Sequence, residues 1–131
     1  MKKTAGIYIH IPFCSVKCMY CDFYSITDRN QDIPFFINSL IKEIELSKTK
    51  YDFDWEFDTI FIGGGTPSLL EPKYIEIIID KINHTFNLSS IKEITLETNP
   101  GEAPLERLKA YKSIGINRLS IGFQSFDPKI L

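Results

Sequence analysis

Several features that would assign a chain to a common protein class are missing from this sequence. There is no excess of positive charge, because 15 lysines and arginines against 17 aspartates and glutamates give a net charge of -2, whereas a nucleic-acid-binding domain normally carries a basic surface. No apolar run approaches the roughly 20 residues that span a bilayer. The apolar opening, which His10 and Pro12 interrupt, is not followed by the small-residue cleavage site of a signal peptide. We therefore expect a cytoplasmic protein that binds no nucleic acid and has no integral membrane segment.

Cysteine is scarce, and its placement is the most informative feature of the sequence. All three cysteines, Cys14, Cys18 and Cys21, lie in the segment YIHIPFCSVKCMYCDF (residues 8–23) with C-x3-C-x2-C spacing. In the cytoplasm cysteines stay reduced, and clustered ones usually bind a metal or take part in catalysis. Fully extended, this spacing would reach about 23 to 25 Å, so the chain must curl back if the three sulfurs are to meet. An iron-sulfur cluster ordinarily has four cysteine ligands, and a 4Fe-4S cluster with three keeps one iron open to a substrate or cofactor.

Two other interpretations of the cysteines stay open at this point. On a helix, positions 14, 18 and 21 share one face, and the cysteines would then be small buried apolar residues. The apolar residues between them leave such a helix without a polar face. Structural zinc is the second alternative, with His10 as the fourth ligand of a Cys3His site. Zinc ligands usually come as separated C-x2-C pairs, and His10 alternates with Ile9 and Ile11 as a strand residue does, so the spacing favours an iron-sulfur cluster.

The hydrophobic pattern predicts alternating strands and helices. Isoleucines at helical spacing, such as Ile75, Ile78 and Ile82, indicate amphipathic helices, and short apolar runs bounded by glycine, proline or asparagine indicate strands. The expected strands cover residues 6–11, 59–62, 91–98 and 118–123, the expected helices 33–48, 73–86 and 104–114, and residues 51–58 form a connector. This βαβαβαβ order implies an α/β fold with parallel strands and right-handed crossovers. Doubly wound sheets and barrels share this order, so the pattern does not separate them.

Polar and glycine-rich motifs follow the strands, at the edge where parallel α/β proteins build their sites. They are the cysteines, GGGTPS at residues 63–68, Glu97 with Asn99, and Gln124. The glycines let backbone atoms approach a ligand closely. The motif is neither a P-loop nor G-x-G-x-x-G, and a plain tight turn is the alternative. Glu97 is placed to accept hydrogen bonds from ribose hydroxyls or an ammonium group, and capping of a helix is the alternative. Gln124 would form hydrogen bonds either with a ligand or with the local backbone.

The chain is shorter than a closed barrel, which needs roughly 200 residues or more. Asp127 and Pro128 would begin a further helix, yet the sequence ends at Leu131, and an uncovered fourth strand would be an open sheet edge. We therefore expect residues 1–131 to be the N-terminal part of a larger domain, with the remaining βα units and a C-terminal domain absent.

Four motifs, taken in order, carry a family resemblance. Y-x-H-I-P-F-C-x3-C-x-Y-C-D-F, GGGTPS, L-E-T-N-P and G-I-N-R-L-S-I-G-F-Q-S-F-D together span residues 8–127. With these motifs the chain resembles the oxygen-independent coproporphyrinogen III oxidase-like group of radical S-adenosylmethionine proteins. The resemblance implies the N-terminal βαβαβαβ portion of a partial, laterally open (β/α)6 TIM-like barrel.

The same resemblance implies two cofactors, a 4Fe-4S cluster and S-adenosyl-L-methionine. Cys14, Cys18 and Cys21 would hold the cluster, and the amino and carboxylate groups of S-adenosylmethionine would chelate its fourth iron. An electron passed from the reduced cluster to the sulfonium would break a carbon-sulfur bond and give methionine and a 5'-deoxyadenosyl radical. By motif position, the residues expected to contact S-adenosylmethionine are Tyr8 and Tyr20 beside the cluster, Gly64, Gly65 and Thr66 at the methionine part, and Glu97 and Gln124 at the rest.

Within this group, the residue two places after the third cysteine separates two branches. Coproporphyrinogen dehydrogenases carry a further cysteine there, whereas this chain has Phe23 and resembles the haem chaperone branch. Such a chaperone binds haem and delivers it to respiratory haemoproteins, with an electron donor for its cluster and a haem-binding region largely beyond Leu131. The alternative is a radical enzyme that oxidatively decarboxylates coproporphyrinogen III to protoporphyrinogen IX. The sequence leaves open whether the protein is an enzyme.

Overall fold

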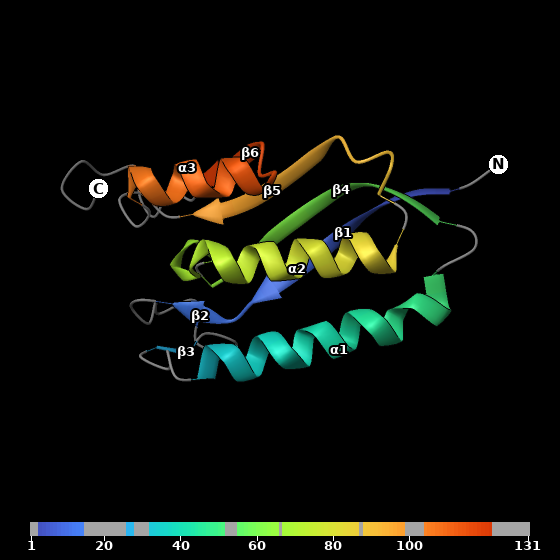
Figure 1. Ribbon diagram of the computed structural model, residues 1–131, viewed down its shortest axis with the longest axis horizontal. Helices are drawn as coiled ribbons and strands as arrows, with labels where there is room; N and C mark the ends of the chain where they lie inside the picture. The colour runs from blue at the N-terminus through green and yellow to red at the C-terminus, as the bar shows by residue number, and fades with distance from the viewer. Residues whose placement is uncertain are drawn as a thin grey trace, which may run out of the picture.

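The computed structural model describes residues 3–14, 26–27, 32–51, 55–65, 67–86, 88–98 and 104–121. Its main sheet has four parallel strands in the spatial order β1-β4-β5-β6. The strands are β1 (Lys3–Ile11), β4 (Trp55–Gly64), β5 (Glu93–Thr98) and β6 (Arg118–Ile121), and the α-helices between them are α1 (Ile33–Tyr51), α2 (Pro72–Thr85) and α3 (Leu105–Ile114). The predicted βαβαβαβ order is confirmed (Figure 1).

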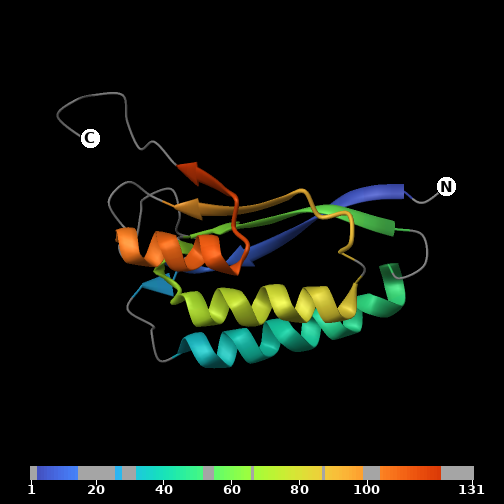
Figure 2. The same ribbon diagram turned by 45° about the horizontal axis from the view of Figure 1, so that its top comes forward.

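The three helices lie on one face of the sheet, as Figure 2 shows. Along the main sheet, each strand lies beside the one that precedes it in the chain. Right-handed crossovers that all advance in the same direction place every helix on the same side, whereas a doubly wound sheet reverses direction and has helices on both faces. The described part of the chain therefore has the arrangement of a barrel segment, and within it the sheet shows no reversal of the doubly wound kind.

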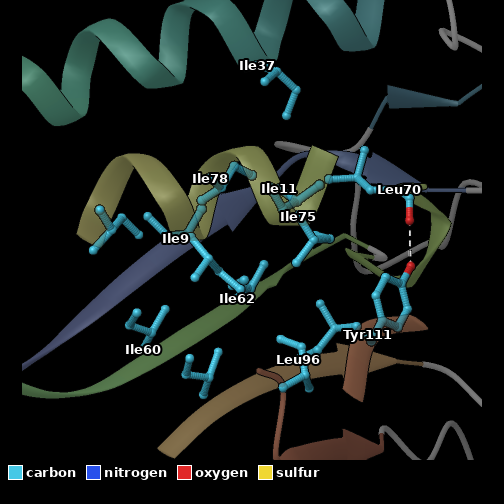
Figure 3. Packing of buried hydrophobic residues seen from close by; sticks show 14 of the residues in the cluster. Ile9, Ile11, Ile37, Ile60, Ile62, Leu70, Ile75, Ile78, Leu96 and Tyr111 are labelled. Atoms are coloured by element: carbon cyan, nitrogen blue, oxygen red, sulfur yellow. Dashed lines mark hydrogen bonds between the residues drawn. The ribbon is translucent and has the colours of Figure 1, made fainter. Parts of the chain in front are cut away.

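The core lies between the sheet and these helices. Side chains of a strand alternate between its faces, so Ile9 and Ile11 of β1 are buried against the helices while Tyr8 and His10 are exposed on the other face. Figure 3 shows how the buried side chains pack together. Those at most 5% exposed include Ile9, Ile11, Ile60, Ile62 and Leu96 from the strands and Ile75 and Ile78 from α2. Full burial of such a side chain contributes about 1.5 to 3 kcal/mol, so this cluster holds the strand ends in place.

The first two strands of the main sheet begin earlier than the sequence pattern predicts. β1 begins at Lys3, and β4 begins at Trp55, so the prediction of a connector over residues 51–58 is wrong for its second half. Two contacts between distant segments explain the difference. Trp55 pairs with Lys3 along the ladder, and the ring of Phe57 packs edge to face on Phe86, just after α2, with centroids 5.2 Å apart.

Other boundaries differ from the prediction by a few residues. β5 begins at Glu93 rather than residue 91, and α1 continues to Tyr51 rather than residue 48. β6 is described as far as Ile121, and the last two residues of the expected strand, 122–123, lie outside the described residues. Gly115, with a φ of +127°, ends α3 as predicted for a C-terminal glycine.

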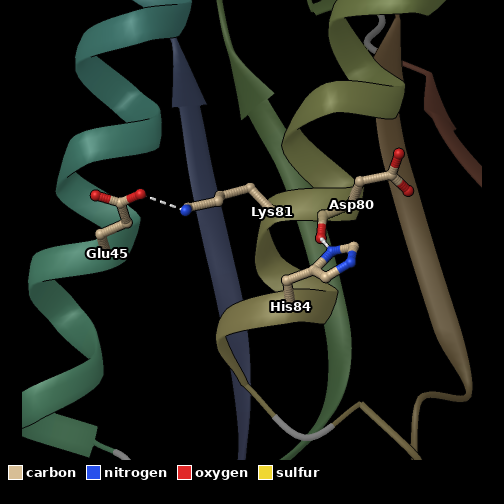
Figure 4. A network of polar contacts seen from close by, with 4 residues as sticks. All are labelled: Glu45, Asp80, Lys81 and His84. Atoms are coloured by element: carbon tan, nitrogen blue, oxygen red, sulfur yellow. Dashed lines mark hydrogen bonds and ion pairs between the residues drawn. The ribbon is translucent and has the colours of Figure 1, made fainter.

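Polar contacts on the outer surface of the helices join α1 to α2. Lys81 of α2 forms an ion pair with Glu45 of α1, and within α2 Nδ1 of His84 donates to the carbonyl of Asp80 at 2.7 Å (Figure 4). A surface ion pair contributes only about 0 to 1 kcal/mol, so the packing of these helices depends mainly on their apolar faces. Of the helices in the described ranges, none is long and apolar enough to cross a membrane.

Candidate functional site

The C-terminal ends of β1, β4 and β5 meet at one edge of the sheet. β1 and β4 end side by side, because Ile11 pairs with Gly64. Of the predicted site residues, the structure describes Tyr8, Gly64, Gly65 and Glu97 in full and Cys14 by its backbone. Cys18, Tyr20, Cys21, Thr66 and Gln124 lie outside the described residues, so their places in the site stay predictions.

The described residues on the two sides of residues 15–25 pair with each other. Directly after β1, the two-residue strand β2 (Phe13–Cys14) pairs in parallel with β3 (Ile26–Thr27), with Cys14 opposite Thr27. The side chain of Phe13 is buried and packs edge to face on Phe36 of α1, with centroids 5.5 Å apart. The backbone of Cys14 is therefore fixed to the core beside the end of β1. The sequence pattern did not predict this strand pair, which is too short to have a period.

The glycine turn after β4 packs directly on the end of β1. The backbone N–H of Gly65 donates to the carbonyl of Ile11 at 2.7 Å. Gly64 has a φ of +120°, and a Cβ at this position would lie 2.4 Å from the same carbonyl oxygen. Glycine is therefore required here on two grounds, its φ and the space available. The close approach that the structure shows is to β1, and an approach to a ligand stays a prediction.

Glu97 connects β5 to this glycine turn. Its Oε1 accepts a hydrogen bond from the backbone N–H of Gly64 at 3.2 Å, and its side chain is partly buried. The partner in this contact is the turn rather than the N-terminus of a helix. An ionised carboxylate has about four acceptor sites, and the bond from Gly64 occupies one of them. Glu97 is therefore able both to hold the turn and to accept hydrogen bonds from a ligand.

Tyr8 lies on the sheet face that the helices do not cover. Its ring stacks on Phe61 with centroids 5.8 Å apart, and its hydroxyl oxygen is 3.2 Å from Nδ1 of His10. Partial burial, and in second place the negative charge of Glu97, raise the pKa of the Tyr8 hydroxyl, which is therefore neutral at pH 7. Sequence reasoning considered His10 only as a zinc ligand. Its pairing with Tyr8 follows from the alternation of a strand, which puts residues two apart on the same face.

Alanine at Gly64 is expected to destabilise the protein more than alanine at Gly115. Both glycines have a positive φ, of +120° and +127°, a region that costs an L residue about 1 to 2 kcal/mol. At Gly115 the new Cβ would meet only a side chain at 3.6 Å, whereas at Gly64 it would collide with the backbone of Ile11, which adds about 1 to 3 kcal/mol. Urea denaturation of both variants of the full-length protein measures the difference. Equal losses of unfolding free energy would show that the turn can move away from β1 without cost.

Comparison with curated proteins finds that the chain is similar to proteins named as haem chaperones. The chain is 42% identical over 131 residues to the "Heme chaperone HemW" of Buchnera aphidicola subsp. Schizaphis graminum, which covers 96% of this chain and 34% of that protein. It is 39% identical over 128 residues to the "Heme chaperone HemW" of Escherichia coli, with 96% of this chain and 33% of that protein covered. The chain thus spans about a third of the length of the curated relatives that it matches.

Comparison with solved structures and family models identifies the fold and the family. The structure described as "Coproporphyrinogen III oxidase (HemN) from Escherichia coli is a Radical SAM enzyme" is 28% identical with a TM-score of 0.85, over 98% of this chain and 30% of that chain. This likeness confirms that the sheet and its helices are the N-terminal portion of a radical SAM barrel. A family model described as "Radical SAM superfamily" matches residues 8–131. Because that match covers nearly the whole chain, the protein belongs to the radical SAM superfamily.

Proposed function

We propose that this chain holds a 4Fe-4S cluster on Cys14, Cys18 and Cys21 and binds S-adenosylmethionine at the fourth iron. Proteins of the radical SAM superfamily generally use these two cofactors. The observation that carries the proposal is the hydrogen bond from Gly64 to Glu97, which joins the ends of β4 and β5 beside the strand pair that fixes Cys14. When bound, the reduced cluster supplies the electron that cleaves a carbon-sulfur bond of S-adenosylmethionine.

The described residues fit the methionine part of S-adenosylmethionine. Its ammonium group needs an acceptor, and Glu97 offers a carboxylate with acceptor sites left after the bond from Gly64. Gly64 and Gly65 have no side chains, so their backbone groups can approach a ligand closely. The ring of Tyr8, with its neutral hydroxyl, adds an aromatic surface on the same face of the sheet as Glu97. The resemblance assigns Thr66 to the methionine part as well, Gln124 to the rest of the molecule and Tyr20 to the cluster side.

We further infer that the full-length protein is a cytoplasmic haem chaperone. It would bind haem, deliver it to respiratory haemoproteins and receive electrons for its cluster from a separate donor. Two observations support this function. The relatives named as haem chaperones are 42% and 39% identical to the chain, against 28% for the coproporphyrinogen III oxidase. Phe23 also stands where the resemblance predicts a further cysteine in a coproporphyrinogen dehydrogenase.

Oxidative decarboxylation of coproporphyrinogen III is the second candidate function. The TM-score of 0.85 against a coproporphyrinogen III oxidase supports it, because the two chains share the barrel elements on which the cofactor residues lie. The two candidates predict the same cofactors. They differ in whether the protein changes a porphyrin or only carries it.

Two assays on the anaerobically reconstituted full-length protein separate the candidates. In the first, haem is titrated into the protein and the Soret absorbance is followed, and a chaperone is expected to saturate at a defined stoichiometry. In the second, coproporphyrinogen III, S-adenosylmethionine and a reductant are supplied, and no protoporphyrinogen is expected. Formation of that product at catalytic turnover would contradict a pure carrier and support the second candidate. A protein that neither binds haem nor forms product would contradict both.

A further inference from the structure

We propose that Tyr111 and Arg107 of α3 position the S-adenosylmethionine-binding turn by holding Ser68. The inference rests on the function proposed above for the turn at Gly64 and Gly65. Glycines have no side chains to pack, so the position of this turn must be set by the groups around it. Tyr111 and Arg107 would act through Ser68, as positioning residues rather than as contacts of the cofactor.

Ser68 is a buried polar residue with several hydrogen bonds. It is 0% exposed and lies in the 3-10 turn Pro67–Leu69, which follows the glycines. Its carbonyl accepts from the Tyr111 hydroxyl at 3.1 Å and from Nη1 of Arg107 at 3.0 Å. Its hydroxyl accepts from Oγ1 of Thr98 at 2.9 Å. Burying polar groups is costly unless they are hydrogen-bonded, so Ser68 has little freedom to leave these partners.

Tyr111 holds this segment at a second point. It is 1% exposed, and its hydroxyl also donates to the carbonyl of Leu70 at 2.5 Å, the contact drawn as a dashed line in Figure 3. A phenol has one proton, which Tyr111 shares between the carbonyls of Ser68 and Leu70. Burial, opposed in part by the charge of Arg107, raises the pKa of Tyr111 to about 12. The hydroxyl therefore stays protonated, and remains a donor, through neutral and mildly alkaline pH.

β5 contacts both the start and the end of the same segment. Glu97 and Thr98 are consecutive, and their side chains point to opposite faces of the strand. Glu97 accepts from the backbone of Gly64 on one side, and Thr98 donates to Ser68 on the other. The glycines are thus fixed by β1 and β5, and residues 67–70 are fixed by β5 and α3. Releasing the end is expected to let the glycines shift, and a displacement of about 1 Å is enough to impair a site that depends on close positioning.

Tyr111→Phe in the full-length protein tests this inference. Phenylalanine keeps the ring in the core but removes the donor to both carbonyls. We expect S-adenosylmethionine to bind about tenfold more weakly, the effect of roughly one lost hydrogen bond, while iron and sulfide per chain stay unchanged. The affinity is measured by titrating S-adenosylmethionine and following the change that it causes in the electron paramagnetic resonance spectrum of the reduced cluster. Thr98→Val, which removes the donor to the Ser68 hydroxyl, is expected to weaken binding in the same direction.

Ile78→Val serves as a control for a general loss of stability. Ile78 is 0% exposed in α2, and removing one of its carbons destabilises the core without changing a donor to residues 64–70. It is expected to bind S-adenosylmethionine as the unmodified protein does. The inference is overturned if Tyr111→Phe and Thr98→Val both bind within twofold of the unmodified protein, or if Ile78→Val weakens binding equally. Unmodified protein that holds its cluster but binds no S-adenosylmethionine would instead overturn the proposed function, and this inference with it.

Discussion

Replacing any one of Cys14, Cys18 and Cys21 with serine is expected to abolish assembly of the 4Fe-4S cluster. The chain already supplies one ligand fewer than the usual four, and a serine hydroxyl is a much harder ligand than a thiolate. Loss of a group in the outer shell of a metal site typically costs about 10- to 100-fold in affinity, and loss of a direct ligand is expected to cost more. Iron and acid-labile sulfide per chain, measured after anaerobic reconstitution, report the effect.

Two further variants make this experiment specific. Ser15→Ala changes the same segment without removing a thiol and is expected to retain the cluster. His10→Ala separates the cluster from the zinc alternative, because a Cys3His site would lose its metal whereas a three-cysteine cluster is expected to keep its iron. Unmodified protein that takes up stoichiometric zinc and no iron would rule out the cluster.

Glu97→Gln is expected to weaken S-adenosylmethionine binding by about 10- to 100-fold. Glutamine keeps a side-chain oxygen that can accept from the backbone of Gly64, so the turn stays in place while the charge that binds the ammonium group is lost. A hydrogen bond to a charged group is worth about 1.5 to 3 kcal/mol, which corresponds to this range of affinity. Glu97→Ala also leaves the N–H of Gly64 without its acceptor and is expected to have the larger effect. Equilibrium titration of the reconstituted full-length protein measures both.

Glu93→Gln is the matched control, because it makes the same change of charge on the same strand. Glu93 forms an ion pair with Arg118 at 3.6 Å, and both side chains are substantially exposed, so the pair contributes little. This variant is expected to bind S-adenosylmethionine as the unmodified protein does. If the two glutamine variants weaken binding equally, the affinity depends on the net charge of β5 and not on a carboxylate at the glycine turn.

Glu97→Gln also has a readout that needs no cofactor. Burial and the negative charge of Glu97 both raise the pKa of Tyr8, because each disfavours the charged phenolate. Removing the charge is expected to lower this pKa, while burial keeps it above the ordinary value of 10.0. Tyrosinate absorbance, titrated in the variant and in Glu93→Gln, measures the shift, with Tyr8→Phe to assign the signal. An unchanged pKa in Glu97→Gln would show that the two side chains are not neighbours in solution.

The sequence predicted those elements whose residues follow a local period. Ile75, Ile78 and Ile82 of α2 repeat at helical spacing and are buried as expected, and Gly115 ends α3 where a C-terminal glycine was predicted. The prediction was wrong at residues 55–58, which were interpreted as a connector because of their acidic residues. Their aromatic and acidic residues alternate as in a strand, and they join the sheet, where Trp55 pairs with Lys3 and Phe57 packs on Phe86.

The candidate site was likewise predicted only where the motifs are visible in the sequence. Motifs at the ends of parallel strands predicted that the glycine turn and Glu97 would converge, and the hydrogen bond between them confirms this. The importance of Ser68 was not foreseen, because in the sequence it only interrupts a G-x-G-x-x-G pattern. The partners of its carbonyl come from α3, where Tyr111 falls at an apolar position of the helical period. The available signal was the hydroxyl of Tyr111, since a buried tyrosine usually finds a hydrogen-bond partner.

The alternation at the end of β5 makes the length of this strand as important as its composition. A deletion or insertion of one residue within Glu93–Thr98 would turn each later side chain of the strand to the opposite face of the sheet. The carboxylate would then turn toward the helices and the hydroxyl away from them, and both of the contacts that β5 makes with the turn would be lost together. A point substitution removes only one of them. Natural variation and protein engineering should therefore tolerate changes of residue type in β5 far more readily than changes in its residue count.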